Sequence, residues 1–132
     1  MHRSRFAGIV IDSQTGDLEA AAEFWSKALG MPFRWPDGTN EGGLYRELDS
    51  RSRDLHLEVQ KVDHPSRVHL DIEADDIEAE VRRLEALGAK RVQLFPRWWV
   101  MEAPTGHRFC VVRVQSPEGF TRTANVWGRE EG

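Results

Sequence analysis

The stretch DLEAAAEFWSKALG (residues 17–30) decides the fold, because the chain repeats it as DIEAEVRRLEALG (residues 76–88). Both copies begin with aspartate, carry apolar residues at helical spacing and end in Ala-Leu-Gly. A repeat of this kind indicates a duplicated structural unit. We therefore predict two amphipathic helices, one in each half of the chain.

Strands are predicted on both sides of each helix, from β-branched and alternating apolar residues. Asp17 and Asp75 are the expected helix N-caps, Asp75 with Glu78 as a capping box, and Gly30 and Gly88 end the helices. The pattern predicts an α+β fold of two tandem βαβββ units, about 5–62 and 66–115, that form a curved mixed sheet around a cleft. A tail over 116–132 follows. The expected strands cover 6–12, 33–35, 43–49 and 55–61, then 68–73, 91–95, 98–103 and 108–115, with a turn-rich loop at 36–42.

Length and charge exclude several classes of protein. A chain of 132 residues fits one domain, and 18 basic against 22 acidic residues argue against nucleic acid as a partner. The apolar run at 7–11 is too short to cross a bilayer, so we expect no membrane partner. The single cysteine, Cys110, allows no internal disulfide, and we expect a cytoplasmic location. Phosphate-binding loops and contiguous catalytic motifs are absent, so any chemistry comes from residues on separate strands.

Three stretches resemble the vicinal oxygen chelate superfamily, also called the glyoxalase / bleomycin-resistance / extradiol-dioxygenase fold. They are DLEAAAEFWSKALGMPF (17–33), VHLDIEADDIEAEVRRLEALGAKRV (68–92) and MEAPTGHRFCVV (101–112). The resemblance is strongest to small glyoxalase-like domains, and it implies a homodimer. Phe120 and Trp127 in the tail also need cover, which favours the same association.

The resemblance also implies where a metal would bind. Metal enzymes of this family place ligands on the first and last strands of each half. His69 matches the second-half histidine, and Glu58 is a candidate for the first-half carboxylate. Ala7 or Gly8 stands where the family has His or Glu, and Cys110 stands where it has Glu, so the resemblance implies at best His69, Glu58 and a third ligand at Cys110. Because a catalytic site usually needs about three protein ligands, we predict no metal and no cofactor.

Strand alternation gives an independent set of site residues. Leu70 and Ile72 are expected to face the helices, so His69 and Asp71 point the other way. By the same argument, Leu57 and Val59 are expected to face the helices, so His56 and Glu58 point away from them. We expect His69 and Glu58 to be catalytic, with Asp71 orienting the His69 ring; a purely structural role for each stays open.

Aromatic residues and the cysteine complete the predicted site. Trp98 and Trp99 are neighbours on one strand, so one of them faces the helices and the other faces the cleft. We expect Trp99 to contact the ligand, together with Trp35, Asp71, His56 and Cys110. For Cys110, a small buried hydrophobe is the competing interpretation.

Three functions follow from these residues. The preferred one is a protein that binds a small organic molecule in the cleft without a catalytic metal. The alternatives are a metal-dependent lyase, isomerase or dioxygenase, and a metal-free enzyme that uses His69 with Asp71 for acid–base chemistry.

Overall fold

The computed structural model describes residues 1–35 and 43–128; the predicted loop at 36–42 lies outside the described residues. The chain divides into two compact units: unit 1 comprises Met1–Ala7 with Leu70–Gly132, and unit 2 comprises Gly8–His69. Strands β1 (His2–Gln14) and β4 (Arg67–Ala74) each contribute residues to both units.

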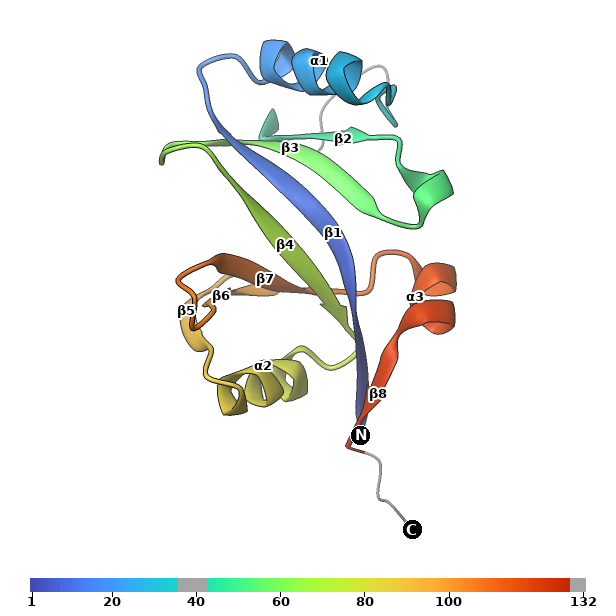
Figure 1. The fold of residues 1–132 in the computed structure, drawn as a ribbon, viewed down its shortest axis with the longest axis vertical. Coiled ribbons are helices and arrows are strands. Elements are labelled where there is room, and N and C mark those ends of the chain that lie inside the picture. The colour runs from blue at the N-terminus through green and yellow to red at the C-terminus, as the bar shows by residue number, and fades with distance from the viewer. Residues whose placement is uncertain (36–42, 129–132) are drawn as a thin grey trace. The chain divides into compact units, whose positions relative to one another are not determined.

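Unit 2 contains three paired strands and helix α1 (Figure 1). The C-terminal part of β1 pairs in parallel with β3 (His56–Val62), and β2 (Tyr45–Leu48) pairs antiparallel with β3 on its other side. A short 3-10 turn at Arg51–Arg53 links β2 and β3. The strand expected at 33–35 is reduced to one bridge between Phe33 and Leu48.

Helix α1 (Leu18–Leu29) begins and ends where the sequence predicts. The Asp17 side chain accepts a hydrogen bond from the Ala20 backbone N–H at 3.1 Å, and Gly30 closes the helix with φ 68°. Leu18 and Ala22 of the helix form a buried cluster with Val59 of β3. This packing fixes one face of β3 against α1 and leaves the other face for polar side chains.

Unit 1 contains the second half of the repeat. β7 (Arg108–Arg113) pairs in parallel with β4 and antiparallel with β6 (Trp98–Glu102), which continues to β5 (Lys90–Leu94). Helix α2 (Ile77–Ala86) lies against these strands (Figure 1). The buried hydrophobic cluster of unit 1 consists of Ala74, Val81, Leu84, Met101 and Val111.

The cap of α2 differs from the prediction by one residue. The Asp76 side chain, not that of Asp75, accepts from the Ala79 backbone N–H at 3.0 Å. Asp75 instead bonds Arg3, through the backbone N–H at 2.8 Å and the guanidinium Nε at 3.2 Å. The predicted capping box at Asp75 is therefore wrong, because β1 occupies the side chain that would have formed it.

The tail forms helix α3 (Pro117–Thr123) and strand β8 (Asn125–Trp127), which pairs with the start of β1. Phe120 is only 2% exposed. The Trp127 indole donates to Ser4 Oγ at 2.8 Å, and the Arg83 guanidinium lies 3.9 Å from its ring centre. Both aromatics are covered within the chain, so they no longer support a homodimer.

The structure is a mixed α+β fold with a mixed sheet, as predicted. In the described part of the chain, none of the helices has the length and apolar character needed to span a bilayer.

Candidate functional site

Asp12 and His69 form a shielded polar contact in unit 2. Asp12 lies near the end of β1 and its Oδ2 is 2.6 Å from Nδ1 of His69 in β4. The side chains are 3% and 13% exposed, so the hydrogen bond is largely shielded from water. Asp12 pairs in register with Gln60, while the adjacent Ile11 packs against the α1 core. Alternation therefore puts Asp12 on the face of β1 opposite α1.

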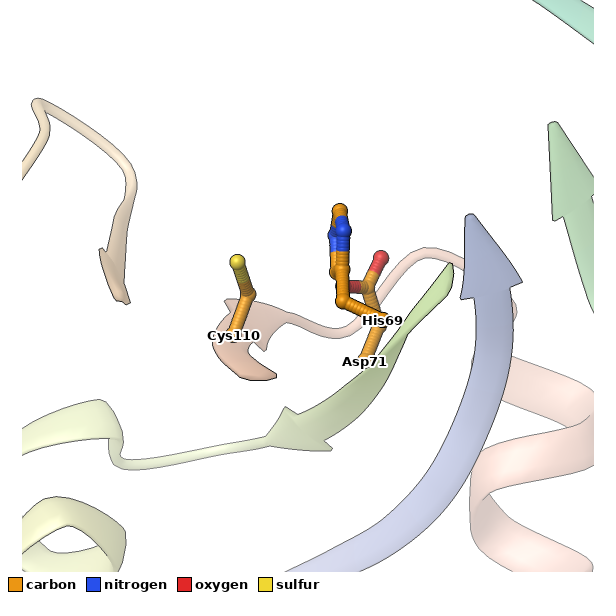
Figure 2. A group of neighbouring side chains, drawn as sticks. All are labelled: His69, Asp71 and Cys110. Carbon is orange, nitrogen blue, oxygen red and sulfur yellow. The ribbon is translucent and has the colours of Figure 1, made fainter. Parts of the chain in front are cut away.

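Asp71 and Cys110 lie beside His69 along β4 and β7. Asp71 is two residues after His69 in β4 and is the register partner of Cys110. One potential ligand atom from each of the three residues lies within 4.8 Å of the others. Figure 2 shows the three side chains projecting from the same side of their strands. Asp71 and Cys110 are 7% and 9% exposed.

The predicted orientation of Trp99 is corrected. Trp99 pairs with Val111, and both belong to the apolar side that packs around α2. Cys110 pairs with Val100 and so faces the other way. Of the two neighbouring tryptophans, Trp98 therefore shares the face of Cys110, where it stacks on Phe95 with ring centres 4.8 Å apart.

A second group of polar residues surrounds Glu47 in unit 2, and we call it the Glu47 cluster: Arg34, Trp35, Glu47, His56 and Glu58. His56 lies between two carboxylates, with Nδ1 2.7 Å from Glu47 Oε1 and Nε2 3.2 Å from Glu58 Oε2. Arg34 binds the same Glu47 carboxylate at 3.2 Å, and the Trp35 indole N–H donates to it at 3.1 Å.

The charges of this cluster are set by its hydrogen bonds. Burial opposes protonation of His56, but the bonds to Glu47 and Glu58 outweigh it and raise the pKa of His56 to about 10. Burial likewise opposes the ionised form of Glu47, yet His56 and Arg34 hold the pKa of Glu47 below its ordinary value. At neutral pH His56 is thus a fixed imidazolium held by two carboxylates, which makes it a poor general base.

The structure groups the predicted site residues differently from the sequence. His69, Asp71 and Cys110 come together, while Glu58, His56 and Trp35 gather around Glu47. Sequence reasoning missed Asp12 and Glu47, which anchor the two groups. Asp12 follows the buried run of the first strand, and alternation with Ile11 was a signal that could have identified it.

The residues present satisfy part of what a metal site requires. Imidazole, carboxylate and thiolate are all ligands of divalent transition metals, and His69, Asp71 and Cys110 supply one of each. Asp71 is a potential donor that the sequence analysis did not count among the ligands. Gly8 cannot be replaced by a ligand without movement, because a Cβ there would lie 2.8 Å from the His56 carbonyl oxygen of β3.

The fold and these positions define a glyoxalase-like protein, and comparison with known families agrees. Residues 8–112 match the glyoxalase-like domain family, so the chain belongs to that family. The predicted resemblance is confirmed. No protein with a curated description matches the chain.

Solved structures share the fold at low sequence identity. A variant of Streptomyces coelicolor methylmalonyl-CoA epimerase in complex with 2-nitronate-propionyl-CoA is 17% identical with a TM-score of 0.57, covering 85% of this chain and 98% of that chain. A hypothetical protein from Bacillus halodurans is 11% identical with a TM-score of 0.60, covering 86% and 96%. At these identities the similarity establishes the fold and no shared activity.

Proposed function

We propose that the protein binds a small organic molecule on the polar face that carries Asp12 and His69. The observation that carries the proposal is the 2.6 Å hydrogen bond between these two shielded side chains. A carboxylate and an imidazole lose hydration when they leave water, and their mutual hydrogen bond offsets part of that cost. Family membership supports the same proposal.

The arrangement suits recognition of a polar group on the ligand. The Asp12 carboxylate bonds His69 Nδ1 and so fixes the orientation of the ring. Asp71 and Cys110 add an acceptor and a soft sulfur beside it. In the Glu47 cluster, Trp35 offers an aromatic surface that is 58% exposed.

Thermal-shift measurements test this proposal. The panel contains flat aromatic and cationic antibiotics, bleomycin among them, and methylmalonyl-CoA. We expect at least one compound to raise Tm, and His69→Gln to weaken its binding at least tenfold, since a charged or ring-specific hydrogen bond contributes about 1.5–3 kcal/mol. His107→Gln, at an exposed turn, is the matched control and should bind within twofold of the unmodified protein. A panel without any stabilising compound, or a His69 variant that binds normally, contradicts the proposal.

A metal-dependent lyase, isomerase or dioxygenase is the second candidate. The group His69, Asp71 and Cys110 favours it, because these three residues supply the number of protein ligands that catalytic sites commonly use. A bound divalent ion would act as a Lewis acid on substrate oxygens. The chain's own part would be to hold that ion and to orient His69 through Asp12. Metal analysis of protein purified without chelator separates the two candidates.

We also propose that the protein is cytoplasmic and forms a homodimer. The single buried thiol of Cys110 is consistent with a reducing compartment. Dimer formation rests on the family resemblance, and light scattering after size exclusion tests it. A mass equal to one 15.1 kDa chain at all concentrations would contradict the homodimer.

A further inference from the structure

We infer that Asp12 recognises a protonated amine, so that the site selects cationic nitrogen compounds and rejects carboxylates. The inference rests on the small-molecule function proposed above and names the chemical class of its ligand. All residues that carry the argument lie in unit 2, between Gly8 and His69.

The carboxylate of Asp12 is hydrogen-bonded at one oxygen. Its Oδ2 lies 2.6 Å from Nδ1 of His69, whereas its Oδ1 is buried and meets no hydrogen-bond donor among residues 1–35 and 43–128. The side chain is 3% exposed, so bulk water compensates little of this loss. A buried acceptor without a donor costs free energy that a bound molecule with an N–H group would recover.

The neighbouring side-chain amide is directed elsewhere. Gln60 is the register partner of Asp12 on β3, but its Nε2 donates to the Tyr45 hydroxyl at 3.2 Å. Tyr45 lies on β2, on the side of β3 away from β1. The amide would have to give up this bond to serve Asp12, so the donor for Oδ1 is best supplied by a ligand.

Charge decides which kind of donor the site prefers. The carboxylates of Glu47 and Glu58 hold the His56 imidazolium between them and are thus compensated. The guanidinium of Arg67 lies 3.9 Å from Oδ2 of Asp12, beyond hydrogen-bond length, and its side chain is 47% exposed. An ammonium group on Oδ1 would compensate Asp12 more directly, because charge-assisted hydrogen bonds are stronger than neutral ones. A ligand carboxylate there would be repelled.

Arg67 is the group with which a cationic ligand competes. Exposed ion pairs contribute little to stability, so this side chain can turn into solvent at small cost. That movement would relieve the repulsion between its guanidinium and a bound ammonium group. Removing the charge of Arg67 should therefore strengthen the binding of amines.

Three small probes of similar size test the inference without any substitution: benzylamine, benzyl alcohol and benzoate. Each carries one aromatic ring, and at pH 7 they differ in charge at the polar end. Ligand-observed NMR titrations give the affinities. We expect benzylamine to bind at least about tenfold more tightly than benzyl alcohol, and benzoate to bind most weakly.

Two variants locate the preference. Asp12→Asn keeps the size of the side chain but removes its charge, and it should weaken benzylamine at least about tenfold while leaving benzyl alcohol nearly unchanged. Arg67→Gln should tighten benzylamine about twofold or more. Asp63→Asn and Arg53→Gln, at exposed positions, are the matched controls and should bind as the unmodified protein does. Circular dichroism verifies that each variant is folded.

Three results would overturn the inference: equal affinities for benzylamine and benzyl alcohol, tightest binding of benzoate, or an undiminished amine preference in folded Asp12→Asn. If the probes show no such preference while a compound of the thermal-shift panel binds and is weakened in His69→Gln, only this inference fails. If neither the probes nor the panel bind, the proposed function fails with it.

Discussion

Gly8 shows how one residue limits the chemistry that this fold can hold. A Cβ at this position would lie 2.8 Å from the carbonyl oxygen of His56 and 3.0 Å from its Cβ. Because the nearest atom belongs to the backbone of β3, it cannot move aside as a side chain would. The close pairing of β1 with β3 thus depends on glycine at this point.

Gly8→Ala is therefore expected to destabilise the protein by about 1–3 kcal/mol, the usual cost of forcing extra volume into a packed region. The free energy of unfolding in urea measures it. Gly16→Ala is the matched control, because a Cβ there meets nothing within 4 Å; its effect should stay within about 0.5 kcal/mol. Equal effects of the two substitutions would show that the backbone of β3 can move aside to accommodate a side chain at Gly8.

His56 makes stability depend on pH in the alkaline range. Its pKa is about 10 in the folded protein and near 6.5 when unfolded, so the folded state binds the proton more tightly. The stabilisation is complete below pH 6.5 and is lost as the pH rises through 10. We expect the free energy of unfolding to fall between pH 7 and pH 10.

His56→Gln should flatten this fall and destabilise the protein at pH 7 by about 1–3 kcal/mol, since Glu47 and Glu58 lose the charge between them. Urea unfolding at pH 6, 7, 8, 9 and 10 measures both effects. His107→Gln should keep the slope of the unmodified protein. An unchanged slope in His56→Gln would mean that another group titrates.

Residues that share a strand face were predictable, whereas their partners on other strands were not. Alternation placed His69 and Asp71 on one strand face because their strand has a clear apolar side. Cys110 was assigned to the site from the family resemblance and not from alternation. Glu47 became the centre of a cluster through its register with Glu58, and register is invisible in a single sequence. The orientation of Trp99 was predicted wrongly because its strand, WWVME, is apolar at four of five positions. Such a strand shows no alternation that would tell its buried face from its exposed face.

At the scale of elements, both repeated helices were predicted because their signals are local: a capping aspartate, an apolar stripe and a final glycine. The cap of α2 was shifted because two aspartates are adjacent there. The choice between them depends on Arg3, which binds Asp75 from a strand far away in the sequence.

The Asp76 cap can be tested by substitution. Asp76→Ala removes the acceptor for the Ala79 N–H and should cost about 1 kcal/mol of unfolding free energy. Thermal unfolding measures the change. Asp63→Ala, at an exposed position, is the control and should leave Tm nearly unchanged. A cost at Asp76 no larger than at Asp63 would contradict its role as the cap.

The tail was the element that sequence reasoning missed. Helix α3 has seven residues, too few to show an apolar period, and it is held by contacts with distant segments. Arg5 donates to Thr123 Oγ1 at 2.9 Å and to Glu73 at 2.9 Å, and the backbone N–H of Gln115 donates to the same Glu73 carboxylate at 2.8 Å. Helix α3 and strand β8 are thus an integral part of unit 1.

Phe120→Ala should therefore destabilise the protein by about 3–5 kcal/mol, because the ring is almost fully buried. Phe24→Ala is the matched control, since that ring is 61% exposed and should cost less than about 1 kcal/mol. Urea unfolding compares the two variants. A small effect at Phe120 would show that the tail contributes little to folding.

At the scale of the whole molecule, the duplication gives each half a buried cluster of its own. One is centred on Val81 in unit 1 and the other on Val59 in unit 2, and they share no residue in the described parts of the chain. Leu18 and Ala22 of the first repeated helix and Val81 and Leu84 of the second belong to these clusters, so the repeated segments of the sequence supply part of each.

Val59→Ala and Val81→Ala should each cost about 1–3 kcal/mol, and their effects should add within about 0.5 kcal/mol in the double variant. Urea unfolding of the three variants gives the comparison. An interaction energy above about 1 kcal/mol would mean that β1 and β4, which contribute to both units, transmit strain from one cluster to the other.

The backbone contact at Gly8 has an evolutionary consequence. The family resemblance implies an acidic or histidine side chain at the position of Ala7 or Gly8. In this protein Ala7 is only 3% exposed, and a side chain at Gly8 would meet the backbone of β3. A single codon change that restored such a side chain would be selected against, because the folded state would suffer before any catalytic benefit arose. A ligand in the first half would therefore need a position other than Gly8.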